Sequence, residues 1–369
     1  MTRRATLLAL SALGASYRFF LKGQAVGPAS LMDFEPLAKQ VISPMAFEYI
    51  ASGAADEITL RANREAWNKI SLKPRVLVDV SRIDTKQTLL GQELAFPILL
   101  APTATHKLVH PQGELATTRA ASASNITFVV STLSSVTIEE ISKAANSTLW
   151  FQLYVQKDRS ITRELMKRSE VAGCRAFCIT VDTPVRGVRD HDVRAGYHLP
   201  PGVQFANIET RPGELGPQVL NASLTWSDID WVRSQTRLPV LLKGILSAED
   251  ASTAAKEGFA GVIVSNHGAR NLDTTPATVE ALPLVVDKVN GQIPVLVDGG
   301  IRRGTDVLKA IALGATAVLI GRPYLYGLGY RGEEGVSQVV RMLRTEFQAA
   351  MALTGQTSIA GINRSILWS

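Results

Sequence analysis

Cysteine is scarce in this chain of 369 residues, which has only Cys174 and Cys178. Both lie in the segment AGCRAFCITVD, where a helix end runs into a strand. Their spacing suits neither a zinc site nor a redox pair, and no second cluster of metal ligands is present. We therefore expect two buried, reduced packing residues and no metal.

Long apolar runs are also missing, so no integral membrane segment is expected. Hydrophobic residues make up 46% and charged residues 20% of the chain, a globular composition rather than a disordered one. The net charge of +6 owes four charges to Arg3, Arg4, Arg18 and Lys22, ahead of the first acidic residue. The chain after these N-terminal residues is only mildly basic, and no nucleic-acid partner is expected.

The first 25 residues differ from the rest in character. MTRRATLLALSALGA joins a twin arginine to a short apolar run, as in a twin-arginine export signal. Gly23-Gln24-Ala25 offers a small-x-small site at which cleavage could follow. We predict an export signal over residues 1–25. The alternative is an uncleaved amphipathic start on a cytoplasmic protein.

Eight short apolar runs alternate with helical patterns from residue 97 onward, which predicts βαβ units and a parallel sheet. The expected strands are 97–102, 126–132, 148–154, 176–182, 239–244, 261–266, 293–300 and 317–323. Eight such units close a (β/α)8 TIM barrel.

Helices are expected at 113–124, at 247–258 with Ser247 as N-cap, and at 303–314 ending on Gly314. Residues 32–73 are predicted to form a helical extension before the barrel. Residues 190–224 hold PPG, RPG and GP turns and little periodicity, which predicts a long, functional or mobile loop after the fourth strand.

Every predicted strand ends in residues that indicate a functional site, most of them polar, and in such a barrel these ends share the face that carries the chemistry. In chain order they are Pro102, Thr103 and Ala104; Ser131; Gln152 and Tyr154; Thr180 and Asp182; Lys243; Ser265 and His267; Asp298; and Arg322. Packing alone does not account for eight such endings at one rim.

The loops after the last two strands read DGGIRRG and GRP, and these loops commonly bind phosphate in a TIM barrel. Gly299, Gly300 and Gly321 let backbone N–H groups approach closely, while Arg302 and Arg322 can pair with a dianion. We predict a phosphate site here.

The segment SNHGAR supplies a candidate acid–base group, His267, with Arg270 three residues further on. Asp182 from the fourth strand could fix the tautomer of His267 and stabilise its cation. A guanidinium binds a carboxylate with two hydrogen bonds, so the substrate is expected to be an acid.

At this point the sequence resembles the FMN-dependent α-hydroxy-acid oxidase and dehydrogenase family, over residues 32–367. The resemblance rests on several motifs: YIASGAADEITLRAN, PTATHK, FQLYVQKD, ITVDTP, LLKG, VSNHGAR, DGGIRRGTD and IGRP. It implies oxidation of a small or medium L-2-hydroxy acid to the 2-oxo acid, with FMN as cofactor.

The resemblance also implies roles for individual residues. His267 would be the base, Asp182 its partner, Tyr154 a ligand of the substrate oxygen, and Lys243 a cation beside the flavin ring. Arg189, Arg270 and Tyr49 would bind the substrate carboxylate, with Leu133 beside the substrate's tail where glycolate oxidases carry Trp. The remaining cofactor contacts would come from Pro102, Thr103, Ala104, Ser131, Gln152, Thr180, Ser265, Asp298, Gly299, Gly300, Arg302, Gly321 and Arg322.

The electron acceptor stays open at the level of sequence. O2, reduced to hydrogen peroxide, is the leading hypothesis, and a quinone or cytochrome acceptor is the rival. A flavin-binding barrel without turnover is disfavoured because the His and Arg residues are all present. Another FMN barrel, such as an isomerase, is disfavoured by the SNHGAR and Tyr49 matches. The resemblance further implies a homo-oligomer, a tetramer.

Overall fold

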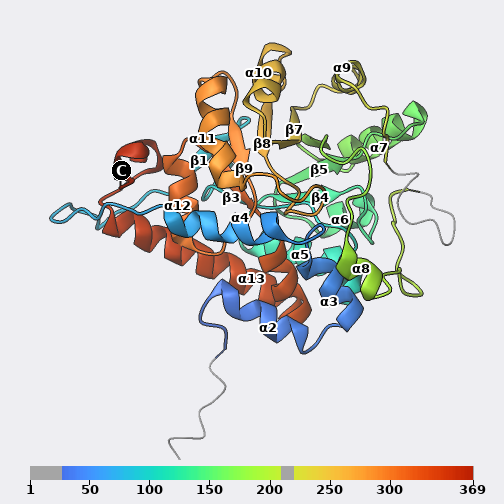
Figure 1. The fold of residues 1–369 in the computed structure, drawn as a ribbon, viewed down its shortest axis with the longest axis horizontal. Coiled ribbons are helices and arrows are strands. Elements are labelled where there is room, and N and C mark those ends of the chain that lie inside the picture. Colours follow the sequence, from blue (N-terminus) through green and yellow to red (C-terminus); the bar gives the residue numbers. More distant parts are fainter. Residues whose placement is uncertain (1–26, 209–219, 369) are drawn as a thin grey trace, which may run out of the picture.

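Eight parallel strands close into a barrel in the computed structural model, which describes residues 27–208 and 220–368 (Figure 1). The last strand pairs with the first through Val318 and Ile98, so the sheet has no edge. All eight predicted strands are confirmed. They are β3 (Ile98–Leu100), β4 (Phe128–Ser131), β5 (Leu149–Leu153), β6 (Phe177–Thr180), β7 (Val240–Ile245), β8 (Gly261–Val264), β9 (Val295–Val297) and β10 (Ala317–Ile320).

Alternate residues of these strands fill two different cores, as the period of two in a strand requires. Leu99, Val129 and Trp150 belong to the cluster inside the barrel, while Ile98 and Val130 belong to the larger cluster packed under the helices. A hairpin of β1 (Gln87–Leu89) and β2 (Gln92–Leu94) adds Leu89 and Leu94 to the interior cluster. Cys178 joins the interior and Cys174 the outer cluster, both as free thiols.

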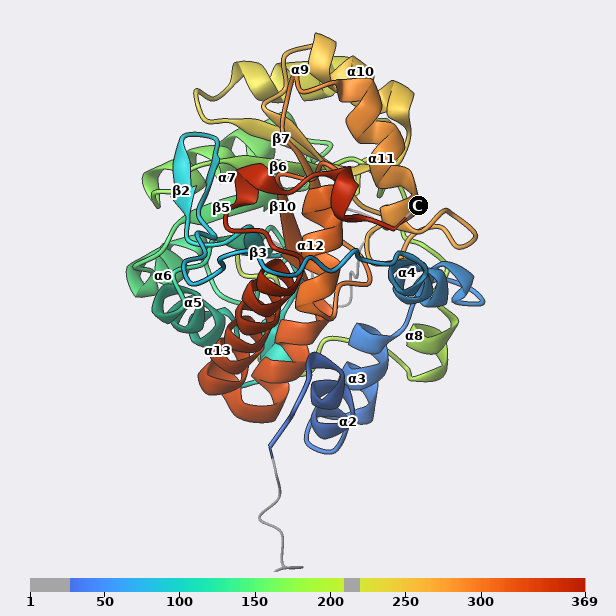
Figure 2. The same cartoon turned by 90° about the vertical axis from the view of Figure 1, so that its left-hand side faces the viewer.

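Helices cover the outside of the barrel (Figure 2). The Ser247 cap is confirmed, because its Oγ accepts a hydrogen bond from the Asp250 N–H at 3.2 Å. Gly314 has a φ of +104°, as a glycine following a helix end allows. The helices are α5 (Gly113–Ala123), α6 (Ile138–Ala144), α7 (Arg159–Val171), α9 (Trp226–Ser234), α10 (Ala248–Lys256), α11 (Thr278–Val289), α12 (Gly304–Ala312) and the kinked α13 (Arg322–Leu353).

The helical extension before the barrel consists of α2 (Phe34–Lys39), α3 (Pro44–Ala51) and α4 (Ile58–Lys69). In α4, Asn63 exchanges two side-chain hydrogen bonds of 2.9 Å with Asn266, which follows β8. This reciprocal amide pair fixes the extension against the end of the barrel that carries the predicted site.

The expected long loop after β6 contains a short helix, α8 (Asp190–Arg194), that lies beside α3 (Figure 2). The rest of its described part is irregular. Residues 209–219 of this loop, like the predicted export signal at 1–25, lie outside the described residues.

Candidate active site

A cavity of about 220 Å³ opens at the carboxyl end of the barrel and gathers nearly every predicted site residue. Two predicted residues, Asp182 and Ser265, are not in its lining, but each hydrogen-bonds a residue that is. The predicted residues that line it are Tyr49, Pro102, Thr103, Ala104, Ser131, Leu133, Gln152, Tyr154, Thr180, Arg189, Lys243, His267, Arg270, Asp298, Gly299, Gly300, Arg302, Gly321 and Arg322.

His267 stands between a carboxylate and a phenol. Its Nδ1 lies 2.9 Å from Asp182 Oδ1, and its Nε2 lies 3.4 Å from the Tyr154 hydroxyl. The Thr183 hydroxyl donates to the same Asp182 oxygen at 2.9 Å. Because Asp182 can only accept, it holds the N–H at Nδ1 and leaves Nε2, on the Tyr154 side, free to take a proton.

The backbone that presents His267 is unusual. His267, Gly268 and Ala269 have φ values of +58°, +63° and +62°, three consecutive left-handed residues. This conformation costs a non-glycine residue about 1–2 kcal/mol. The turn is held by Asn266 Oδ1, which accepts from the Ala269 N–H at 3.1 Å. The strained turn directs the imidazole back toward β6.

Burial lowers the pKa of His267 below its ordinary value, and Asp182 only partly opposes this. Burial would raise the pKa of Asp182, but the attraction of His267 and Lys243 prevails, and that pKa is lowered. The pair at rest is therefore a neutral imidazole beside a carboxylate. This arrangement can accept one proton and stabilise the cation that results.

Two arginines lie on the same side of the cavity as Tyr49. Arg270 Nη1 donates to the carbonyls of Tyr49 and Ser52 at 2.6 and 2.9 Å, and its guanidinium lies 4.8 Å above the Tyr49 ring. Arg189 Nε donates to the Arg270 carbonyl at 3.0 Å. These contacts leave other N–H groups of both arginines to bind an anion.

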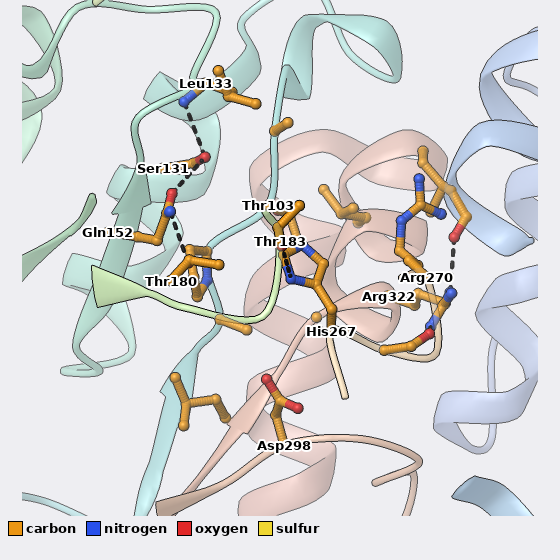
Figure 3. A pocket seen from close by; sticks show the side chains of 18 of the residues that line it. Thr103, Ser131, Leu133, Gln152, Thr180, Thr183, His267, Arg270, Asp298 and Arg322 are labelled. Carbon is orange, nitrogen blue, oxygen red and sulfur yellow. Dashed lines mark hydrogen bonds between the residues drawn. The ribbon is translucent and has the colours of Figure 1, made fainter. Parts of the chain in front are cut away.

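A hydrogen-bonded row runs across the ends of β4, β5 and β6 (Figure 3). Ser131 Oγ donates to Gln152 Oε1 at 3.2 Å, and Gln152 Nε2 donates to Thr180 Oγ1 at 2.8 Å. All three side chains are buried. The row fixes the orientation of the Gln152 amide, which suits the recognition of a polar ring edge.

Lys243, Ser265 and Asp298 form a compact buried cluster on the ends of β7, β8 and β9. Lys243 Nζ lies 2.9 Å from Ser265 Oγ and 3.2 Å from Asp298 Oδ2. Burial alone would lower the pKa of Lys243, but Asp298 and Asp182 raise it, so the ammonium stays charged. Asp298 Oδ1 is buried, has no hydrogen-bond partner within residues 27–208 and 220–368, and can accept from a ligand hydroxyl.

The predicted phosphate loops bring Arg302 and Arg322 to the cavity. Burial lowers the pKa of both guanidinium groups, and neither forms an ion pair with a carboxylate of the described part of the chain. Arg322 donates to the carbonyls of Ile50, Gly268 and Ser52, each within 2.9 Å. Its other N–H groups are left to bind an anion. A partly desolvated guanidinium with no carboxylate of the described residues in ion-pair range is suited to an anionic ligand.

Gly300 is required at its position in this loop. Its φ is +73°, and a Cβ there would lie 1.8 Å from the Asn63 carbonyl oxygen. The close approach of α4 to the loop therefore depends on this glycine.

The cavity fits FMN by the chemistry of its lining. It offers apolar walls, the fixed Gln152 amide, the Lys243 cation, a free Asp298 oxygen for a ribityl hydroxyl, and the two arginines for a phosphate.

Several lining residues were missed by the sequence analysis. Tyr197 stacks on Tyr49 with ring centroids 4.1 Å apart and planes 7° from parallel. Arg186 lies 5.6 Å from the Tyr197 ring, and Phe205 and Leu220 complete this wall. These residues follow β6 in irregular chain, where no periodicity marks a functional position. Thr183 was detectable only as the neighbour of Asp182.

Comparison with known proteins identifies the family of this chain. The family model described as FMN-dependent dehydrogenase matches residues 38–369. An L-lactate oxidase of Nostoc sp. is 48% identical, covering 92% of this chain and 98% of that protein. Glycolate oxidase 3 of Oryza sativa subsp. indica is 47% identical, covering 91% and 95%. A crystal structure of mandelate oxidase with (S)-2-phenylpropionate has a TM-score of 0.86 at 41% identity, covering 92% and 98%.

The fold and cavity define an FMN-dependent barrel oxidoreductase. The chain belongs to the FMN-dependent dehydrogenase family, to which α-hydroxy-acid oxidases belong, as its sequence motifs predicted. FMN is accordingly its cofactor.

Within residues 27–208 and 220–368, none of the helices has the length and apolar character needed to cross a membrane.

Proposed function

We propose that this protein oxidises a small or medium L-2-hydroxy acid to the 2-oxo acid and passes the electrons to O2, forming hydrogen peroxide. The observation that carries the proposal is the contact of the His267 imidazole with the Asp182 carboxylate on one side and Tyr154 on the other, in one cavity with Arg189 and Arg270. Bound FMN would take up the two electrons of the substrate and deliver them to O2.

Each group in the cavity has a part that follows from its chemistry. Arg189 and Arg270 bind the substrate carboxylate and so fix the hydroxyl-bearing carbon. The Tyr154 hydroxyl hydrogen-bonds the substrate oxygen. His267 Nε2 takes a proton from the substrate, and Asp182 stabilises the imidazolium that forms. His267 and Asp182 are only 22% and 14% exposed, and their partial burial strengthens the attraction between the imidazolium and the carboxylate.

The remaining predicted cofactor residues take the parts that their positions favour. Asp298, Gly299, Gly300, Arg302, Gly321 and Arg322 would hold the ribityl chain and phosphate. Lys243 would place its charge beside the ring and stabilise the anionic reduced form. Ser265 lies behind Lys243 and Asp298 and would orient both. Pro102 to Ala104, Ser131, Gln152 and Thr180 would contact the ring.

The tail of the substrate would meet Leu133, Phe205 and Leu220, which line the cavity. These apolar side chains favour an aliphatic tail over the bare CH2 of glycolate. We therefore place the preferred substrates between lactate and longer aliphatic 2-hydroxy acids.

Replacing His267 tests the reaction chemistry. His267→Gln should retain FMN and lose about 10²–10⁴-fold in the rate of anaerobic flavin reduction by lactate, the usual contribution of a general base. His198→Gln is the matched control, because His198 is exposed and, among the described residues, hydrogen-bonds only the Gly196 carbonyl. Flavin reduction at the wild-type rate in the His267 variant would contradict the assignment.

The acceptor is tested on the wild-type protein. Flavin reduced anaerobically with lactate is exposed to air, and its reoxidation is followed by absorbance with hydrogen peroxide measured in parallel. Reoxidation within the turnover time supports the oxidase. Slow reoxidation that a quinone or cytochrome accelerates would favour the alternative, a dehydrogenase.

We further propose that the protein is a homo-oligomer, with tetramer as the expected state. Val76 and Leu77 are 80% and 103% exposed, side by side in the segment between α4 and β1. Two neighbouring apolar side chains this exposed favour burial against a second copy of the chain. Leu77→Asp should reduce the mass of the oligomer measured by light scattering. An unchanged mass would show that this segment is not part of the subunit interface.

Finally, we propose export through the twin-arginine pathway. The proposal rests on the sequence of residues 1–25 alone. Replacing Arg3 and Arg4 by lysine should retain the protein in the cytoplasm of the expressing cell. A mature protein that still begins at residue 1 or 2 would argue against a cleaved signal.

A further inference from the structure

A buried row of side chains lies behind Thr103, which lines the cavity. Thr117 Oγ1 lies 2.9 Å from His106 Nδ1, and His106 Nε2 lies 2.7 Å from Thr103 Oγ1. Thr103 Oγ1 is in turn in close contact with the Tyr324 hydroxyl, which donates to the Ala101 carbonyl at 2.8 Å. His106, Thr117 and Tyr324 are completely buried, so water cannot complete their hydrogen bonds. The proposed acid–base chemistry uses none of the three.

Counting the protons decides the direction of every bond in this row. Burial lowers the pKa of His106, so its ring is neutral and carries one N–H. The Ala101 carbonyl can only accept, so the Tyr324 proton points to it. Tyr324 oxygen then accepts the proton of Thr103, and His106 must donate its Nε2–H to Thr103. His106 Nδ1 accepts from Thr117.

The opposite direction leaves groups unsatisfied. If the N–H of His106 were on Nδ1, Thr103 would donate to Nε2 and Tyr324 to Thr103. The Ala101 carbonyl would then lose its donor, and the buried Thr117 hydroxyl proton would have no acceptor. Each such loss leaves a buried polar group unpaired and destabilises the folded protein. The first arrangement is therefore the stable one.

We propose that this row fixes the Thr103 hydroxyl as a hydrogen-bond acceptor toward the cavity, with Tyr324 and His106 as positioning residues for the cofactor. The Thr103 oxygen accepts the His106 N–H with one lone pair, and the Thr103 hydroxyl proton is donated to Tyr324. The Thr103 oxygen then has one lone pair left for the cavity. Any group in the cavity that meets this oxygen has to donate to it.

The consequence concerns the redox potential of FMN, and it rests on the proposed function, in which Thr103 contacts the flavin ring. Reduction adds hydrogen to the ring, so the reduced form has more N–H to donate than the oxidised form. A hydroxyl that only accepts stabilises the reduced form, and one that is free to donate stabilises the oxidised form. The buried row thus raises the flavin potential.

Tyr324→Phe is the sharpest test, because it deletes the single oxygen that receives the Thr103 proton. The freed proton can then point into the cavity. We expect the ratio of the affinities for reduced and oxidised FMN to fall about tenfold, which lowers the midpoint potential by about 30 mV. Tyr330→Phe on the same helix has no part in the row and should leave the potential unchanged.

A double-mutant cycle with Thr103→Val separates positioning from a general loss of stability. In the Thr103→Val protein no hydroxyl remains to reorient. Adding Tyr324→Phe should therefore lower the melting temperature, but the midpoint potential of FMN should equal that of the Thr103→Val single variant. A shift of equal size in both backgrounds, or none in the wild-type background, would overturn the inference.

A pair of variants at Thr103 keeps the proposal testable if Tyr324→Phe does not fold. Thr103→Val should lower the potential through loss of the acceptor, and Thr103→Ser should keep the wild-type value. Equal potentials in the two variants would refute the inference. Wild-type protein that binds no FMN, or whose flavin no hydroxy acid reduces, would instead contradict the proposed function itself.

Discussion

Replacing Asp182 by asparagine isolates the charge behind His267. The substitution keeps the size of the side chain and one oxygen that can accept hydrogen bonds from His267 Nδ1 and from Thr183. In the wild-type structure this oxygen lies 2.9 Å from His267 Nδ1. What it removes is the negative charge that stabilises the imidazolium during turnover. The two side chains are only 22% and 14% exposed, so solvent screens this interaction only in part.

The expected loss is the difference between a hydrogen bond to a charged group, about 1.5–3 kcal/mol, and one to a neutral group, about 0.5–1.5 kcal/mol, which leaves about 1–1.5 kcal/mol. At about 1.4 kcal/mol per factor of ten, kcat/KM should fall roughly 5- to 12-fold. The pH profile should move as well. His267 has to be neutral to act, and Asp182 raises its pKa. Without that charge the pKa falls further, so the acid limb of kcat/KM should shift to lower pH.

Stopped-flow reduction of bound FMN by lactate from pH 5 to 9 measures both effects. Thr183→Val serves as control. It removes one hydrogen-bond donor to the same carboxylate but leaves the negative charge in place, so the acid limb should not shift to lower pH. An Asp182→Asn rate within twofold of wild type, or an acid limb displaced to higher pH, would refute the reasoning.

Three further outcomes are expected. Arg270→Met should raise KM for lactate steeply, and wild type should use lactamide poorly; equal activity on lactate and lactamide would contradict carboxylate recognition. The kcat/KM for 2-hydroxybutyrate should exceed that for glycolate, since each buried methylene adds about 0.8 kcal/mol of binding free energy. Leu133→Trp should reverse this order of substrates. A wild-type preference for glycolate would show that Leu133 does not shape the pocket. Gly300→Ala should weaken FMN binding and lower the melting temperature far more than Gly291→Ala. Both glycines have φ near +74°, but only at Gly300 would an added Cβ clash with a neighbour. Equal losses in the two variants, measured by flavin titration and thermal unfolding, would exclude the clash with Asn63 as the cause.

The sequence by itself determined the barrel and the rim of polar residues. β-Branched apolar runs mark buried parallel strands, and parallel strands linked by helices all end at one face. Gln152, Lys243 and Asp298 could therefore be assigned to a common site although they are far apart in the chain. The Gly-Gly-Ile-Arg loop indicated an anion site for the same reason.

Contacts that depend on how the barrel closes were decided only by the tertiary structure. Thr103 and Tyr324 meet because β10 pairs with β3, which places the start of α13 beside the loop after the first barrel strand. Tyr197 reaches Tyr49 because α8 packs against α3. Neither contact has a periodic pattern in the sequence, since each joins single residues from segments whose packing is fixed only when the whole fold forms.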